Sequence, residues 1–356
     1  MRRTLACLVL VATAWTAPGD AGAGRTRVRP GSLGRAALRA RTLGRPLPRR
    51  AIARRPVARR PPSGPGRLEP RTAFGRELFL YLPPGFRPGD RRRYRVLILQ
   101  DGQNLFGEGT GSWQVHRAID AEVQAGRIEP VIVVGIPAQP SHQRRVAEYA
   151  VHRDDAEQLG GAGAAYIDFL ADRLVPWLRR ELPVRSGPDA IAIGGSSMGA
   201  RIALEAALAR PDTFGKVIAM SPSVWFNGRE ILRRVEDGDR LPETFELYLD
   251  SGGSGDSRDD ADNVARLRDA FLARSFEHGS WDAPARRAPR RLWHWFEPRH
   301  RHDEAAWRER FPRALRVMFP AGQAFRATSA ATTADSISAT EMGRVEMRGP
   351  RDMDPR

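Results

Sequence analysis

The sequence predicts an α/β fold with a mostly parallel central sheet and helices on both faces. Short apolar runs, such as PVIVVGI at 130–136, alternate along the chain with longer runs that carry apolar residues at helical spacing. Strands that are apolar on both faces are typical of a parallel sheet covered by helices. A glycine-rich hinge, GGSSMG at 194–199, joins one such strand to one such helix. In sheets of this kind reactive groups gather at the carboxyl ends of the strands.

The first half of the expected sheet comes from three runs separated by turn signals. Residues 76–82 alternate in polarity and meet Pro83-Pro84-Gly85, a sequence that ends a strand. Residues 94–99 form a buried-strand run that ends at QDGQN, and residues 130–136 are almost wholly apolar. Helical spacing of apolar residues predicts helices at 113–123 and 164–181.

The second half of the expected sheet starts at the hinge. Residues 190–193 predict a short buried strand, and residues 198–208 predict a helix that ends before Pro211. The rest of the domain repeats the alternation of strand and helix. Strands are expected at 216–220, 245–249 and 292–296, and helices at 260–274 and 304–318.

The hinge contains two serines, and their neighbours favour Ser197 as a nucleophile. A nucleophile elbow needs the pattern G-x-S-x-G, because its tight turn strains the serine backbone and small neighbours let the strand and helix approach. Ser197 has glycines at both offsets, whereas Ser196 has Met198 two residues later, where a side chain would obstruct the turn. We therefore expect an α/β-hydrolase fold, without a large lid domain.

The N-terminus has the layout of a secretory signal. Two arginines precede an apolar stretch at 5–15, and small residues follow, ending in Ala21-Gly22-Ala23, an A-x-A cleavage pattern. The apolar stretch is too short for a confident membrane span. We expect a signal peptide at 1–23, export to the periplasm or the medium, and no transmembrane domain after cleavage. Cys7 is the single cysteine and lies in this segment, so we expect folding without disulfides.

Nearly all of the net charge lies before the expected domain. Residues 1–71 hold seventeen arginines and two acidic residues, so they carry most of the net charge of +16. Their Arg/Pro-rich composition from residue 24 cannot bury enough apolar surface to offset the entropy of ordering, which predicts a disordered linker at 24–71. A solvated tether is favoured, and weak association with anionic cell-surface polymers is the alternative; no signature supports specific nucleic-acid binding. The hydrolase domain is expected at 72–322, followed by a disordered tail at 323–356.

A serine nucleophile needs a base to take its proton and an acid to hold that base. In this fold the chain order is serine, acid, histidine. His302 follows the strand run RLWHWF on a strand-to-helix loop, so we expect its imidazole within hydrogen-bonding distance of the Ser197 hydroxyl. His300 is the main alternative, whereas His294 lies within the predicted strand.

The acid is expected in the loop that follows the strand FELYL. The run DSGGSGD leads into a glycine-rich loop that ends at Asp256, which is the predicted acid. Asp250 is still on the strand, and Asp259 and Asp260 are better placed to cap the following helix. The choice between Asp256, Asp250 and Asp259 stays open.

An acyl-transfer site also needs two donors for the oxyanion. One is the backbone N–H after the nucleophile, here Met198, and the other comes from the loop after an earlier strand. The QDGQN loop is the candidate, with Gln103 as its likeliest donor. Asp101 in the same loop is explained better as a turn former than as a direct participant.

Six blocks, in order, resemble the putative esterase family, an α/β-hydrolase group with enterochelin esterase-like, feruloyl esterase-like and S-formylglutathione hydrolase-like members. The resemblance covers residues 75–320. It includes VLILQDGQNLF, SWQVHRAIDAEVQAGRIEPVIVVGI, RRVAEYAV, GGSSMGARIALEAALARPDTFGKVIAMSPSVWF, YLDSGGSGD and HRHDEAAWRERFPRALRVMF.

By this resemblance, the candidate residues match family positions. Ser197 matches the nucleophile, His302 the histidine, Asp256 the acid, and Met198 and Gln103 the oxyanion donors. The sequence departs from the family in two places: Asp303 stands where asparagine is usual, and extra glycine and acidic residues follow the strand before the acid.

The resemblance also implies roles near the pocket. Arg145, Glu148 and Tyr149 match an R-x-x-E-Y block that we expect to order the loop beside the pocket. A purely structural ion pair is at least as well favoured as contact with the substrate. Tyr149 is also a candidate pocket residue, as are Trp113 and Trp225, for which core packing is the alternative.

These observations predict an exported serine esterase acting on a small-molecule or glycan-linked ester, without a cofactor or metal. An acyltransferase with the same machinery and a non-catalytic surface-binding protein are the alternatives. A metal site is disfavoured, because adjacent loop residues rarely converge on one ion without a distant ligand. Its ligands would be His300, His302, Asp303 and Glu304.

Overall fold

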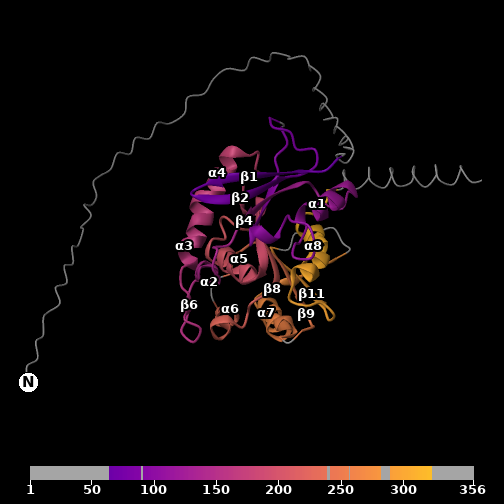
Figure 1. Ribbon diagram of the computed structural model, residues 1–356. Helices are drawn as coiled ribbons and strands as arrows, with labels where there is room; N and C mark the ends of the chain where they lie inside the picture. Colours follow the sequence, from indigo (N-terminus) through magenta and orange to yellow (C-terminus); the bar gives the residue numbers. More distant parts are fainter. Residues whose placement is uncertain (1–63, 90, 239–240, 256, 282–288, 323–356) are drawn as a thin grey trace, which may run out of the picture. The chain divides into compact units, whose positions relative to one another are not determined.

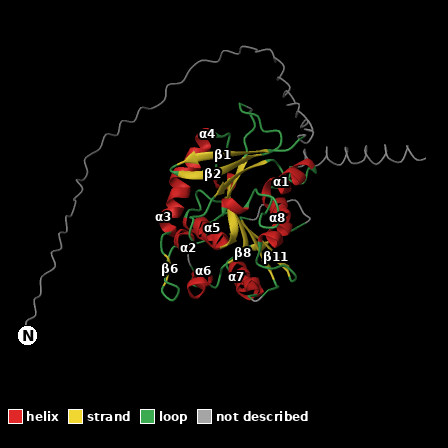
Figure 2. Ribbon diagram, viewed as in Figure 1, coloured by secondary structure: helices red, strands yellow, loops and turns green. Residues whose placement is uncertain are grey.

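The computed structural model describes residues 64–322, apart from 90, 239–240, 256 and 282–288. The predicted signal peptide, the predicted tail at 323–356 and most of the predicted linker lie outside the described residues. The described part has a central sheet with helices on both faces (Figure 1, Figure 2). No helix in this part is both long and apolar enough to span a membrane.

The main sheet of the described residues has nine strands in the order β1-β2-β4-β3-β7-β8-β9-β11-β10. Strand β2 pairs antiparallel with β1 and β4, and every other neighbouring pair is parallel. The sheet is therefore mostly parallel, as predicted. Its strands are β1 (Arg67–Ala73), β2 (Arg76–Leu82), β3 (Arg95–Gln100), β4 (Val131–Ile136), β7 (Ile191–Ser197), β8 (Lys216–Pro222), β9 (Phe245–Gly252), β10 (Glu277–His278) and β11 (Arg290–Glu297).

Three strands extend further at their carboxyl ends than the apolar runs predict. Strand β7 continues to Ser197, β8 to Pro222 and β9 to Gly252. The ladder continues because parallel pairing uses backbone groups, so glycine, serine and aspartate can take part in it. These extensions bring polar residues of three adjacent strands to one edge of the sheet.

Strand β1 corrects the predicted boundary of the linker. It begins at Arg67, inside the segment 24–71 that the sequence predicts to be disordered, and it pairs along its whole length with β2. Most of its side chains are exposed, so it lacks the apolar alternation that signals a strand. Backbone pairing at the sheet edge, rather than side-chain burial, places it in the fold.

The helices divide between the two faces of the sheet. Helices α1 and α8 pack on one face, around a cluster that includes Ile119 and Phe311. The other helices cover the opposite face, where Leu170, Leu204 and Phe271 share one core. The helices are α1 (Val115–Gln124), α2 (His142–Tyr149), α3 (Gly163–Asp168), α4 (Val175–Glu181), α5 (Met198–Ala209), α6 (Phe226–Glu236), α7 (Ala261–Ala273) and α8 (Glu304–Met318).

The helix predicted at 164–181 is present, with an irregular centre. A π-helical segment, Phe169–Leu174, joins α3 to α4. Pro176 lies in the first turn of α4 and has no backbone N–H to donate, so regular hydrogen bonding cannot continue through this region. A small separate sheet pairs β5 (Arg153–Asp154) with β6 (Leu159–Gly160).

The turn between β7 and α5 depends on close backbone packing. A Cβ atom at Gly195 would lie 2.9 Å from the Gly199 carbonyl carbon and 3.1 Å from Gln100 Cβ. One at Gly199 would lie 2.9 Å from both Gln100 Cβ and Asp101 Oδ2. The two glycines therefore allow the strand, the helix and the loop after β3 to meet.

We expect Gly195→Ala to lower the free energy of unfolding by about 1–3 kcal/mol, because the added methyl group overpacks this turn. Urea unfolding followed by circular dichroism measures the change. Gly111→Ala is the matched control, since nothing lies within 4 Å of the position that its Cβ would take. Equal stability of both variants would show that the turn has room to spare.

Candidate active site

Ser197 lies at the turn between β7 and α5 with a strained backbone. Its φ is 55° and its ψ is −127°, a region that a non-glycine residue adopts only when the surrounding structure enforces it. Its side chain is partly accessible, whereas Ser196 is buried in the strand. The turn predicted at 194–199 is thus present, with Ser197 as its accessible serine.

The Ser197 hydroxyl is hydrogen-bonded to Ser223. The two Oγ atoms are 3.1 Å apart, and the Ser223 N–H donates to the Ser197 carbonyl at 3.2 Å. Although Ser197 and His302 are both within the described residues, no hydrogen bond joins their side chains. The predicted approach of the His302 imidazole to the Ser197 hydroxyl therefore stays a prediction.

His302 is paired with a buried carboxylate. It lies on the loop between β11 and α8, and its Nδ1 is hydrogen-bonded to Asp259 Oδ1. The Trp307 ring packs edge-on against the imidazole, with the ring centroids 5.0 Å apart. The side chain of Asp259 is fully buried, while that of His302 is 37% exposed. This pairing leaves Nε2 of His302 as the nitrogen available to a reacting group.

The carboxylate on His302 is Asp259, whereas Asp256, the acid predicted from the sequence, lies outside the described residues. The sequence predicts that Asp259 caps α7, but its side chain does not. Its φ is 56°, and Arg258 and Asp260 beside it also have positive φ. This left-handed turn directs the carboxylate back to β9, where Asp259 Oδ2 accepts the N–H of Gly252. The backbone turn alone sets where the Asp259 carboxylate points. The sequence therefore does not distinguish Asp259 from the aspartates beside it.

The alternative histidines have other partners. His300 Nε2 lies 3.1 Å from Glu309 Oε2, and Arg268 Nη1 contacts His294 Nδ1 at 3.4 Å. Asp303 caps α8 by accepting the Ala306 N–H at 2.9 Å. The residues of the disfavoured metal site therefore diverge, and the described residues contain no group of three side chains that could hold a metal ion.

Arg145 and Tyr149 of the R-x-x-E-Y block hold the loop after β3, whereas Glu148 pairs with Arg76 on β2. Arg145 donates two hydrogen bonds to the Asp101 carboxylate, at 2.7 and 2.8 Å. The Asp101 N–H donates to the Tyr149 hydroxyl at 3.1 Å. Burial lowers the pKa of Arg145, but its bonds to Asp101 outweigh this and raise the pKa overall. Asp101, with φ 55°, is thus a clamped residue as well as a turn former.

The clamped loop carries Gln103 two residues after Asp101, which lies against Gly199. Gln103 lies in the turn Gly102–Asn104, and its side-chain oxygen accepts the Ala138 N–H at 2.9 Å. The neighbouring Asn104 amide donates to Glu304 Oε1 at 3.1 Å, which ties this loop to the start of α8. The backbone of Met198 begins α5, where an N–H has no acceptor within the helix. The loop after β3, the elbow and the His302 loop therefore meet at one edge of the sheet.

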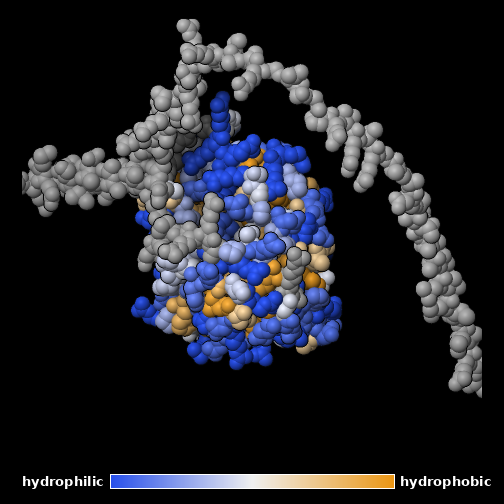
Figure 3. Space-filling view, turned by 180° about the vertical axis from the view of Figure 1, so that it is seen from behind, coloured by the Kyte–Doolittle hydropathy of each residue, from blue (hydrophilic) through white to orange (hydrophobic). Residues whose placement is uncertain are grey.

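Two of the three candidate pocket aromatics are core residues. Trp113 is 2% exposed and packs against Trp307 and Phe311. Tyr149 is fully buried, so it supports the loop and offers no surface to a ligand. Trp225 follows β8 beside Ser223 and is 50% exposed, so it alone of the three is open to a ligand. Figure 3 shows a largely hydrophilic surface on the face it presents, with separate hydrophobic patches.

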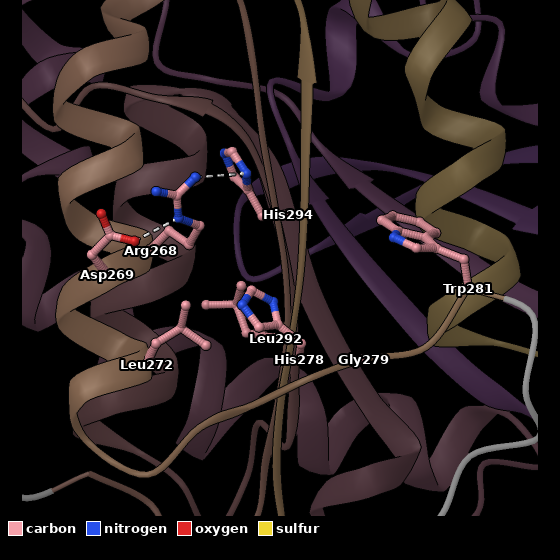
Figure 4. A pocket seen from close by; sticks show the side chains of 8 residues that line it. All are labelled: Arg268, Asp269, Leu272, His278, Gly279, Trp281, Leu292 and His294. Carbon is pink, nitrogen blue, oxygen red and sulfur yellow. Dashed lines mark hydrogen bonds and ion pairs between the residues drawn. The ribbon is translucent and has the colours of Figure 1, made fainter.

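A pocket of about 300 Å³ lies elsewhere, between α7 and strands β10 and β11 (Figure 4). None of its lining residues is Ser197, Asp259 or His302. Burial, followed by the nearby Arg268 charge, lowers the pKa of His294 in this pocket to about 4. The pocket is lined by Arg268, Asp269, Leu272, His278, Gly279, Trp281, Leu292 and His294.

Comparison with known proteins connects this geometry to a family. The family described as "Putative esterase" matches residues 72–318. Iron(III) salmochelin esterase from Escherichia coli is 35% identical over 133 residues, which cover 37% of this chain and 29% of that protein. The uncharacterized protein YjcH from Bacillus subtilis is 28% identical over 182 residues, covering 49% and 69% of the two chains. The structure of the BES protein from Bacillus cereus superimposes with a TM-score of 0.55 and 15% identity, covering 72% and 95%. The predicted α/β-hydrolase fold is confirmed.

We expect His294 to make the protein less stable in mild acid. Its pKa is about 4 when folded and about 6.5 when unfolded, so the unfolded state binds the extra proton as the pH falls through this interval. Stability contributed by the neutral imidazole is complete above pH 6.5 and is lost towards pH 4, by up to about 3 kcal/mol.

Urea unfolding of the wild type and His294→Gln between pH 7 and pH 4 measures this effect. The free energy of unfolding of the wild type, relative to that of His294→Gln, should decrease as the pH falls. His142→Gln, at an exposed histidine, is the matched control. A constant difference across the range would contradict the prediction.

Proposed function

The chain belongs to the putative esterase family, and from this membership we propose that it is an exported serine esterase that forms an acyl-enzyme on Ser197. Membership supports hydrolysis of esters. The serine mechanism is inferred from one observation above all, the strained turn of Ser197 at the sheet edge that also holds the His302–Asp259 pair. Export is inferred from the signal-like sequence at 1–23.

Acylation starts when the Ser197 hydroxyl turns from Ser223 towards His302. Nε2 of His302 takes the proton as Oγ attacks the carbonyl carbon of the ester, because Nδ1 is already engaged by Asp259. The imidazolium then gives this proton to the leaving alkoxide, which departs as an alcohol. The buried Asp259 carboxylate holds the ring in the required tautomer and offsets its transient positive charge.

Backbone donors stabilise the tetrahedral intermediate. The N–H groups of Met198 and Gln103 come from the two segments that meet at the elbow, and we assign them to the oxyanion. The clamp of Arg145 on Asp101 fixes the second segment before substrate arrives, so little reorganisation is needed. Water then attacks the acyl-enzyme as His302 takes its proton, and the imidazolium returns that proton to Ser197 Oγ while the carboxylic acid leaves.

The relatives suggest which esters to test first. Iron(III) salmochelin esterase and three other curated relatives carry names of siderophore esterases. Trp225, two residues after Ser223, is 50% exposed, which suits an aromatic group on the acyl or alcohol part of the substrate. We therefore propose aromatic esters, with siderophore esters among them, as the class to compare with short aliphatic esters.

We expect Ser197→Ala to abolish hydrolysis of p-nitrophenyl esters and labelling by a fluorophosphonate, with a loss of about 10⁴-fold or more in kcat. Ser196→Ala is the matched control from the same turn and should retain labelling. Circular dichroism checks that both variants fold. Labelling that persists in Ser197→Ala would overturn the assignment of the nucleophile.

We expect Asp259→Asn to lower kcat by about 10²–10⁴-fold, because the imidazole loses both its orienting partner and its counter-charge. Steady-state kinetics should compare it with Asp256→Asn, the alternative that the sequence favours. Asp262→Asn, at an exposed residue near the same helix start, is the control. A larger loss in Asp256→Asn than in Asp259→Asn would show that Asp256 is the acid.

A further inference from the structure

Beneath the His302–Asp259 pair lies a buried polar cluster that the proposed mechanism does not use. It contains Asp250, Ser221 and Tyr248, which are fully buried, and Arg310 from α8, which is 2% exposed. Asp250 Oδ2 accepts hydrogen bonds from the Tyr248 hydroxyl at 2.9 Å and from Arg310 Nε at 3.1 Å. Buried charges of this kind contribute little net stability compared with apolar packing. Two members of the cluster, Ser221 and Arg310, contact the Asp259 carboxylate, so the cluster is connected to the candidate site.

Ser221 joins this cluster to the acid. Its Oγ is 2.5 Å from Asp259 Oδ2, 2.7 Å from Arg310 Nη2 and 3.0 Å from Trp307 Nε1. Guanidinium and indole groups are donors only, so they occupy the two acceptor positions of the hydroxyl. Its single hydrogen must therefore point to Asp259. Arg310 and Trp307 together orient the Ser221 hydroxyl as a donor to the acid.

The backbone of Ser221 is held as firmly as its side chain. Its φ is 44°, a strained value for serine, at the carboxyl end of β8. The Ser221 N–H donates to Asp250 Oδ1 at 3.1 Å, so Asp250 supports this conformation. Arg310 Nη2 also lies 3.6 Å from Asp259 Oδ2. The Arg310 guanidinium thus forms ion pairs with both Asp250 and Asp259. It also contacts Asp259 indirectly, through the Ser221 hydroxyl.

We propose that Arg310 and Ser221 are positioning residues that fix the Asp259 carboxylate and set the charge felt by His302. This inference rests on the proposed function. Asp250 and Asp259 carry two negative charges against the single positive charge of Arg310, and the imidazolium formed during acylation matches the excess. Burial raises the pKa of Asp250, and the Arg310 charge opposes that shift.

The charged and titratable groups around the pair come from several elements. Asp250 from β9 and Arg310 from α8 interact with Asp259, and Asp260 lies next to it on the turn before α7. Tyr248 bonds Asp250 and is linked to Asp259 through that carboxylate. Of these, Arg310 is the one positive group. Removal of Arg310, or loss of the Ser221 hydrogen bond, leaves the negative charge of Asp259 less compensated. The protonated imidazole of His302 is then favoured.

The test compares Ser221→Ala and Arg310→Met with the wild type. We expect kcat per titrated active site to fall about 10- to 100-fold in each, with KM changed less than threefold. The acidic limb of the kcat/KM profile should move to higher pH by about 0.5–1 unit, because His302 holds its proton more tightly. Arg316→Met is the matched control, since Arg316 lies on the same helix and pairs with the buried Glu122 instead.

A purely structural role would lower the melting temperature but leave kcat per titrated site and the pH profile unchanged. Unchanged values in Ser221→Ala, the milder substitution, would overturn the inference even if Arg310→Met fails to fold. NMR titration of the His302 ring gives a readout that does not depend on turnover. If no ester is hydrolysed by the wild type, the proposed function fails. An upward shift of the His302 titration in Ser221→Ala would still support the charge relation, and no shift would refute it.

Discussion

The backbone of Ser197 depends on the close approach of three segments, and much of the candidate site follows from this contact. Strand β7, helix α5 and the loop after β3 pack so closely that Gly195 and Gly199 have no room for a side chain. The resulting turn holds Ser197 in a conformation that serine would not adopt alone. The same contact places the first N–H of α5 beside the loop that carries Gln103. One packing constraint therefore sets both the backbone of Ser197 and the approach of the segments that carry the proposed oxyanion donors.

The remaining groups are supplied by the order of the parallel strands. Strands β7, β8, β9 and β11 are neighbours, so the residues that follow them meet at one edge although they are far apart in sequence. Ser221 lies next to the last residue of β8, Asp259 follows β9 and His302 follows β11. Hydrogen bonds join Asp259 to both His302 and Ser221. Helix α8 then returns beneath this edge and brings Arg310 to the cluster. Sheet topology thus assembles the pair, and one helix supports it from below.

The helices and strands were predicted well where the spacing of apolar side chains determines the secondary structure. Strand β2 and helix α8 have the predicted bounds, because their polarity alternates or recurs at helical spacing. Strand β1 was missed because its pairing uses the backbone of an exposed, polar segment. The turn at Ser197 was predictable because glycine spacing encodes it directly.

The partners of the candidate residues could not be predicted in the same way. The choice of Asp259 depends on a left-handed turn of three residues, and no residue type in RDD announces it. Trp113 and Tyr149 looked like pocket residues, but the sequence gives no measure of how deep a loop aromatic is buried. Arg310 resembles any other arginine of α8 until the fold shows that it lies against two carboxylates. These are properties of tertiary contacts between distant segments.

The exposed margins of the described sheet have a bearing on how copies of the protein meet. Strand β1 carries charged side chains and Pro70, which lacks an N–H, and β10 at the opposite margin is only two residues long. Neither margin offers a long row of free backbone groups on which a strand of another molecule could be templated. Self-association through continuous intermolecular sheets, the usual route from an open β-sheet to fibrils, is thereby discouraged by the composition of one strand and the brevity of another.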